Sequence, residues 1–237
     1  MTPIATQFKS LFSGELASLL LVLATFWFGI YLNKRFKLPL LQPILVSLTL
    51  VVLFLNFSGI SYATFFAQSH LLTFMVGPSV VALGYVLFEQ IENFKGHIGS
   101  ILLSVLVGCI VAIVSVVLTA KALEADSVLL ASLAPKSATM PIAVQLSKNA
   151  GGVPELTIAF LVLSGLYGGL IGPSILRLAG VKSKLAIGLS LGAASHAIGT
   201  ARALELGAIE GAASGLAIGI MGILTALVLP LLERLLY

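Results

Sequence analysis

Long apolar stretches and short polar breaks alternate along the chain of 237 residues. A helix needs about 20 apolar residues to span the hydrocarbon core of a bilayer. The pattern predicts a membrane-spanning helix in each of six stretches, which are residues 15–32, 40–57, 71–89, 98–120, 153–176 and 208–230. The sequence therefore predicts an all-α integral membrane protein with about six transmembrane helices.

Two further stretches, 122–149 and 184–206, do not have the pattern of a plain span. Each consists of an apolar segment of about 12 residues, which is shorter than a span, then a polar break and a second short apolar segment. Non-helical backbone at membrane depth is tolerated only where protein or water surrounds it. We therefore expect two re-entrant or broken helical hairpins, with breaks at 135–141 and 195–205.

The basic residues suggest how these segments lie in the membrane. Cytoplasmic loops carry an excess of Lys and Arg, which places Lys34, Arg35 and Lys37 inside. Counting the spans from there, the basic residues at 177–184 fall inside only if 122–149 is a hairpin. If that segment crossed the membrane, the same charges would lie outside. The hairpin is therefore the favoured interpretation.

The C-terminal half has an internal similarity that this orientation makes informative. The stretch 151–177 parallels the stretch 210–234 in its Gly, Pro and Leu residues, and a broken segment precedes each. A hairpin plus one span crosses an odd number of times, so the two copies would have opposite topology. Inverted repeats with broken helices near the midplane are typical of secondary transporters. We expect a four-helix scaffold or oligomerisation region at 1–120 and a transport region at 121–237.

The composition excludes a soluble protein. Hydrophobic residues make up 59% of the chain and charged residues only 9%, with a mean hydropathy of +1.13. Soluble domains carry roughly 25% charged residues. The 23 glycines suit helices that pack closely in lipid. The net charge of +4 lies in short loops, so it bears on orientation and predicts no nucleic-acid partner.

The sequence predicts no cofactor and no enzyme active site. The one cysteine, Cys109, lies in an apolar run, and the three histidines lie on separate segments, so no zinc or haem site is expected. Ser195 and His196 are adjacent, and a helix would point them about 100° apart. No G-x-S-x-G segment accompanies them.

Ionisable residues within membrane segments are expensive and usually functional. Thr139 is a predicted N-cap with Pro141 in the first helical turn, and Thr200 after a break at Gly199 is its predicted counterpart. Two helix N-termini that point into one cavity suit a carboxylate or phosphate. The predicted substrate-binding residues are Lys136, Ser137, Thr139, Ser195, His196, Gly199, Thr200 and Arg202.

Each of these residues also has a simpler structural explanation. Arg202, which can grip a carboxylate, could instead pair with Glu205 at i,i+3. Lys136 could extend to the outer interface. His196 could bond a backbone carbonyl, or it could couple transport to protons, with Glu205 as a partner in an ion pair or in coupling. Glu89 could be a gate residue or a residue at a loop edge.

The segments that hold these residues resemble signatures of the LrgB/CidB family of membrane proteins. The segment APKSATMPIA at 134–143 is similar to the family's LPKSVTTPIA, and GGVP at 151–154 is similar to GGIP. SHAIGTARALE at 195–205 resembles a second long signature. The segments 36–43 and 59–62 also look familial, as do 80–83 and 89–90. Met140 stands where the family usually has Thr, and Val86 stands where it usually has Pro.

The resemblance implies two functions. One is a holin/antiholin-like modulator of murein hydrolase export and autolysis, which acts with a small LrgA/CidA-type membrane protein. The other is a transporter of small monocarboxylates such as pyruvate, glycolate and glycerate. We favour transport across the cytoplasmic membrane, because the predicted site should bind a small anion. A proton or sodium is the expected coupling ion. The commonest symmetry suggests a homodimer.

Overall fold

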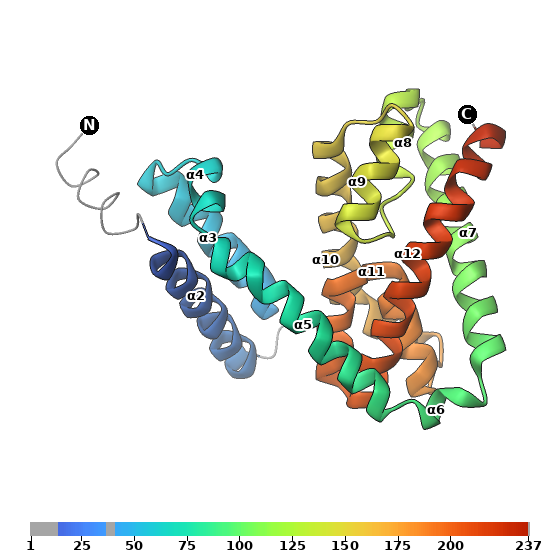
Figure 1. Ribbon diagram of the computed structural model, residues 1–237, viewed down its shortest axis with the longest axis horizontal. Coiled ribbons are helices and arrows are strands. Elements are labelled where there is room, and N and C mark those ends of the chain that lie inside the picture. Colours follow the sequence, from blue (N-terminus) through green and yellow to red (C-terminus); the bar gives the residue numbers. More distant parts are fainter. Residues whose placement is uncertain (1–13, 37–40, 237) are drawn as a thin grey trace. The chain divides into compact units, whose positions relative to one another are not determined.

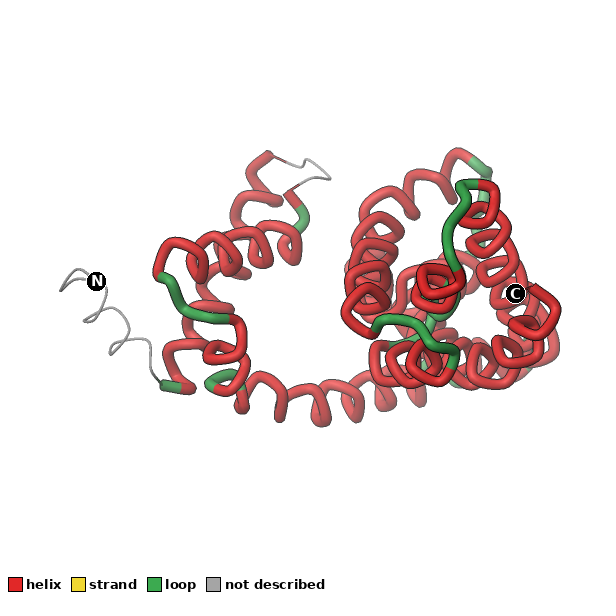
Figure 2. The backbone as a smooth tube through the Cα atoms, turned by 90° about the horizontal axis from the view of Figure 1, so that it is seen from above, coloured by secondary structure: helices red, strands yellow, loops and turns green. Residues whose placement is uncertain are grey.

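The computed structural model describes residues 14–36 and 41–236 (Figure 1). Lys37 and the start of the span predicted at residue 40 lie outside these residues, as does half of the family-like segment 36–43. In the described chain every regular element is a helix, which Figure 2 shows as helices joined by short loops.

Four helices are long and apolar enough to cross a membrane: Glu15–Phe36 (α2), Ile98–Ala122 (α7), Pro154–Leu178 (α10) and Ala208–Leu236 (α12). Two further apolar helices, Pro43–Ser58 (α3) and His70–Glu89 (α5), coincide with the remaining predicted spans. The protein is therefore an all-α integral membrane protein, as the sequence predicts.

The chain forms two compact units, residues 1–82 and 83–237. In the first unit, α2 packs so closely against α3 that a Cβ at Gly29 would lie 2.8 Å from the carbonyl oxygen of Pro43. Thr25 Oγ1 and Ser47 Oγ lie 2.9 Å apart across the same interface. The short helix Tyr62–Ala67 (α4) follows, and Ser61 caps its N-terminus.

The second unit contains α7, α10 and α12 together with Glu92–Lys95 (α6), Ser127–Leu133 (α8), Met140–Asn149 (α9) and Lys184–Leu206 (α11). The structure therefore packs α7 with the C-terminal helices, although the sequence analysis groups it with the N-terminal region 1–120. The division of roles between a scaffold and a transport region stays a prediction.

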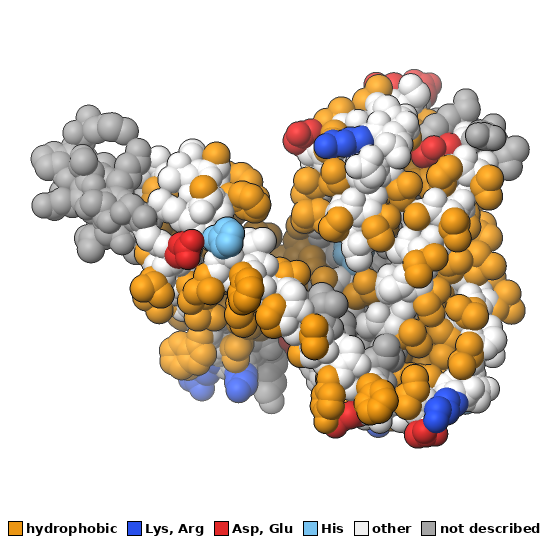
Figure 3. Space-filling model, in the orientation of Figure 1, with side chains coloured by type: hydrophobic (Ala, Val, Ile, Leu, Met, Phe, Trp, Pro, Cys, Tyr) orange, Lys and Arg blue, Asp and Glu red, His pale blue; other side chains and the backbone are white. Residues whose placement is uncertain are grey.

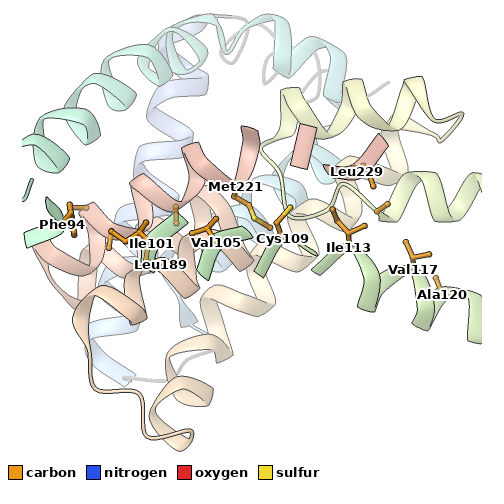
Figure 4. Close-up of a cluster of buried hydrophobic side chains, with 14 of the residues drawn as sticks. Phe94, Ile101, Val105, Cys109, Ile113, Val117, Ala120, Leu189, Met221 and Leu229 are labelled. Carbon is orange, nitrogen blue, oxygen red and sulfur yellow. The ribbon is translucent and has the colours of Figure 1, made fainter. Parts of the chain in front are cut away.

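A stripe of side chains along α7 forms the core of the second unit. Residues 101, 105, 109, 113 and 117 recur every four positions, so they lie on one helix face, and each is at most 2% exposed. Figure 4 shows this line of side chains beside Met221 and Leu229 of α12. Cys109 Sγ lies 3.6 Å from Thr225 Oγ1. This packing holds α7 against α12.

The segment 122–149 is a hairpin. Ser132 of α8 accepts a hydrogen bond from the Val153 N–H (2.8 Å), and Ser147 of α9 accepts one from the Thr157 hydroxyl (2.7 Å). Both arms therefore contact the first turns of α10, so the chain goes in and returns to the same side. Figure 1 shows α8 and α9 together in the upper half of the second unit.

The segment 184–206 is also a hairpin, although a single label, α11, covers both of its arms. His196 has φ 41° and ψ −132°, which reverses the chain. Cβ atoms at Gly188 and Gly211 would overlap with Glu210 and Leu204 respectively, so both arms lie beside the first turns of α12. Figure 1 shows α11 in the lower half of the unit. A hairpin followed by a span thus occurs twice, from opposite sides, as the inverted repeat predicts.

The surface of the second unit suits a protein that lies across a membrane. Figure 3 shows its charged side chains near the two ends, with hydrophobic and uncharged side chains between them. Large apolar side chains such as Leu103, Val111 and Ile223 are more than half exposed. Such a belt is expected where lipid tails replace water.

The hairpin arrangement predicts which positions can be labelled from each side of the membrane. In a Cys109→Ser background, Lys148→Cys and Lys121→Cys should react with an impermeant thiol reagent from outside. Lys182→Cys should react only from inside, because α10 crosses between positions 148 and 182. Labelling of positions 148 and 182 from the same side would show that 122–149 crosses the membrane.

Candidate functional site

The tips of the two hairpins meet inside the second unit. His196 Nε2 lies 3.1 Å from the carbonyl oxygen of Lys136, within hydrogen-bonding distance. His196 is 3% exposed. The histidine therefore bonds a backbone carbonyl, as in its simpler explanation, and this bond joins the two segments that the sequence analysis singles out. The contact leaves its predicted coupling role open.

The first tip is a non-helical segment, residues 134–139, between α8 and α9. Lys136 lies in this segment, half-buried, and its Nζ donates to Ser137 Oγ at 3.3 Å. Among the described residues the structure records no carboxylate paired with Lys136. The ammonium therefore remains at the tip instead of extending to the outer interface, and it is available to an anion.

The N-terminus of α9 adds to the positive potential at this tip. Thr139 is the N-cap residue with extended backbone, as predicted, and Pro141 lies in the first turn. Within the described chain the Thr139 hydroxyl caps no amide of this turn. The first amides of a helix have no intrahelical acceptor and carry the positive end of its dipole. An anion at the tip would meet both these amides and the Lys136 ammonium.

The second tip packs against the middle of α10. A Cβ at Gly168 would overlap with Ser195 Oγ, and one at Gly165 would lie 3.0 Å from His196 Cε1. Ser195 is fully buried, and its Oγ makes no hydrogen bond to any residue that the structure describes. A buried hydroxyl without a partner is costly, so Ser195 Oγ has bonding capacity to offer a ligand.

The sequence analysis misplaces the second break. The chain reverses at His196, not at Gly199, and Thr200 is helical within the second arm instead of capping it. Gly199 is needed for a different reason, because its Cβ would overlap with the carbonyl oxygen of Leu191 in the first arm. Thr200 Oγ1 lies 2.7 Å from Ser214 Oγ of α12. Thr200 therefore holds the arm to α12.

The other predicted residues lie away from the tips. Arg202 forms an ion pair with Glu205, one turn later, and both side chains are partly exposed. At a rise of about 1.5 Å per residue, Arg202 lies about 9 Å along the arm from His196. Glu89 is the exposed last residue of α5. The part of the chain that the structure describes holds no group of three potential metal ligands.

Several residues that hold the hairpins in place are not singled out by the sequence analysis. Hydroxyls of Ser132, Ser147 and Thr157 hold the first hairpin to α10. Gly165, Gly168 and Gly172 face the second hairpin from α10. The spacing of these glycines by three and four residues puts them on one helix face, and this was the available signal.

Comparison with known proteins finds the family that the two signature segments resemble. The model of the LrgB-like family matches residues 22–235. The chain belongs to the LrgB-like family. No solved structure gives a significant match.

Curated relatives cover nearly the whole LrgB-like chain. An uncharacterised Bacillus subtilis protein, YxaC, is 36% identical over 90% of this chain and 93% of its own. The antiholin-like protein LrgB of the same organism is 32% identical over the same shares. The holin-like protein CidB of Staphylococcus aureus is 31% identical over 94% of this chain and 97% of its own.

Glycines at the hairpin contacts should be intolerant of a methyl group. In Gly192→Ala, the new Cβ would overlap with the carbonyl oxygen of Ser214, so we expect a loss of about 1–3 kcal/mol of stability. Gly219→Ala is the matched control, because nothing lies within 4 Å of its Cβ. Thermal unfolding of the detergent-solubilised protein measures both. Equal Tm values for the two variants would contradict the close packing of α11 on α12.

Proposed function

We propose that the protein is a secondary transporter of small monocarboxylates of the pyruvate, glycolate and glycerate type, in the cytoplasmic membrane. The observation that carries the proposal is the meeting of two hairpins from opposite sides at one cationic, partly unsatisfied site. Broken helices that meet inside the protein are the architecture of many secondary transporters.

The charges near the tips support a substrate with one negative charge. Lys136 has no described carboxylate partner, whereas the charge of Arg202 is balanced by Glu205. One carboxylate would balance Lys136, and a second would be left uncompensated at membrane depth, which is expensive. The α9 amides and Ser137 can bond the carboxylate oxygens.

Oxygen atoms next to the carboxylate would also find partners. Ser195 Oγ is buried and free to bond, and the Thr139 hydroxyl caps no amide of α9 in the described chain. A 2-hydroxyl or 2-keto oxygen can bond such hydroxyls, because a hydroxyl both donates and accepts. His196, through its bond to Lys136, would connect substrate binding to the position of the second hairpin. A proton or sodium is the proposed coupling ion.

The second candidate function is a holin-like or antiholin-like membrane protein, in which the chain would modulate murein hydrolase export with a small LrgA/CidA-type partner. The names of the LrgB and CidB relatives favour it. These names support the second candidate more directly than they support transport. A homodimer is proposed for either function.

Uptake in proteoliposomes separates the two functions. A carrier should take up radiolabelled glycolate or pyruvate with saturation and with competition between the two. Lys136→Gln should reduce kcat/KM by roughly 30-fold or more, equivalent to about 2 kcal/mol, because the buried carboxylate loses its counter-charge. Lys121→Gln, which removes a charge outside the site, is the control. Unsaturable passage of unrelated solutes would support a pore, and unchanged uptake by Lys136→Gln would exclude this site.

A double substitution decides the role of Arg202. If the Arg202–Glu205 ion pair is structural, Arg202→Gln should lose activity because Glu205 is left unpaired, and Arg202→Gln with Glu205→Gln should recover to within about threefold of wild type. If Arg202 binds the substrate carboxylate, the double variant should be as impaired as the single one. Initial uptake rates in proteoliposomes measure this.

A further inference from the structure

The two hairpins are held in place by different kinds of contact. The α11 hairpin makes backbone-close contacts, because Cβ atoms at Gly188 and Gly192 would overlap with backbone oxygens of α12. Its two arms also touch each other, since a Cβ at Gly199 would overlap with Leu191. Interfaces of this kind lose their packing with any displacement, because the densely packed interior does not deform continuously.

The α8–α9 hairpin meets α10 itself through hydroxyl groups and through Ala138 and Ala143, which pack against Leu161. It has one backbone-close contact, since a Cβ at Gly152, just before α10, would lie 2.8 Å from the Ser132 amide nitrogen. Ser132 Oγ accepts from the Val153 N–H, and the Thr157 hydroxyl donates to Ser147 Oγ. The six residues 134–139 that separate the arms form turns instead of a close reversal. Gly165, Gly168 and Gly172 of α10 bring backbone next to α11, not next to α9. Hydrogen bonds contribute little net stability, so this hairpin can separate from α10 more easily than α11 can separate from α12.

The helix α9 also has a polar face that is exposed. Gln145, Lys148 and Asn149 lie on this face and are exposed, while Ala143 and Ser147 face α10 and are fully buried. Gln145 Nε2 donates to Asn149 Oδ1 at 2.9 Å. Polar side chains at membrane depth face water or protein, not lipid. The exposed polar face thus suits the Lys148 end of an aqueous path, whereas residues 140–144 next to the tip are apolar.

We infer that the α8–α9 hairpin is the moving gate of the site, whereas the α11 hairpin is its fixed floor. This inference rests on the proposed transport function. Movement of α9 would break the hydroxyl bonds to α10, widen the path along its polar face and admit the substrate to Lys136. The His196–Lys136 contact would form when the gate is closed.

Paired cysteines test which hairpin must move. In a Cys109→Ser background, Ser147→Cys with Thr157→Cys and Thr200→Cys with Ser214→Cys each replace hydroxyls whose oxygens lie 2.7 Å apart. A disulfide joins sulfurs about 2.05 Å apart, so both pairs should oxidise. Oxidation of the 147–157 pair should reduce initial glycolate uptake at least tenfold, and a reductant should restore it. Oxidation of the 200–214 pair should change the rate less than twofold relative to the same variant when reduced.

Equal inhibition by the two cross-links, or inhibition by the 200–214 pair alone, would overturn the inference. If the Cys109→Ser parent shows no saturable uptake, the proposed function fails, and hydrogen exchange in lipid nanodiscs then tests the hairpins independently. Amides of α9 should exchange at least tenfold faster than those of residues 198–206. Exchange as fast in the second arm of α11 would contradict the assignment of gate and floor.

Discussion

A chain that turns back inside a bilayer must satisfy its own backbone, because lipid offers no hydrogen-bond partners. Both hairpins of this protein obey that constraint by lying against a full-length span. The first hairpin uses hydroxyl groups at the start of α10 together with Gly152, and the second uses glycines that admit backbone next to α12 together with the Thr200–Ser214 hydroxyl pair. The order of hairpin and span along the chain follows from this need, since each hairpin requires a covering helix next to it.

Spans and breaks could be predicted from the sequence because they depend on local length and polarity. Each predicted span coincides with a helix, and the two polar segments, 135–141 and 195–205, contain the tips. The position of the second reversal could not be predicted, because a positive φ is usual for glycine and His196 adopts it here. The pairing of Thr200 with Ser214 depends on the fold, which no local pattern shows.

The contrast between Lys136 and Arg202 illustrates how local context decides whether a charge in an apolar chain is balanced. Both are basic residues in polar segments of an apolar chain, and the sequence analysis gives them the same task. The i,i+3 spacing of Arg202 and Glu205 is sufficient to balance one of them within its own helix. Lys136 lies in a turn, and in the described part of the chain no carboxylate pairs with it, so its charge is not balanced in this way.

The short arms of the hairpins also bear on how the protein is made. Neither α8 nor α9, with 7 and 10 residues, is long enough to be retained as a span during synthesis. We therefore expect the first hairpin to enter the membrane together with α10, and the second, whose arms on either side of His196 are similarly short, together with α12. A chain that ended before residue 178 would leave the first tip, residues 134–139, without its covering helix and would expose apolar surface that α10 buries. α7 and the second hairpin have their cover only when α12 is complete, so the stability of the C-terminal unit depends on its last helix.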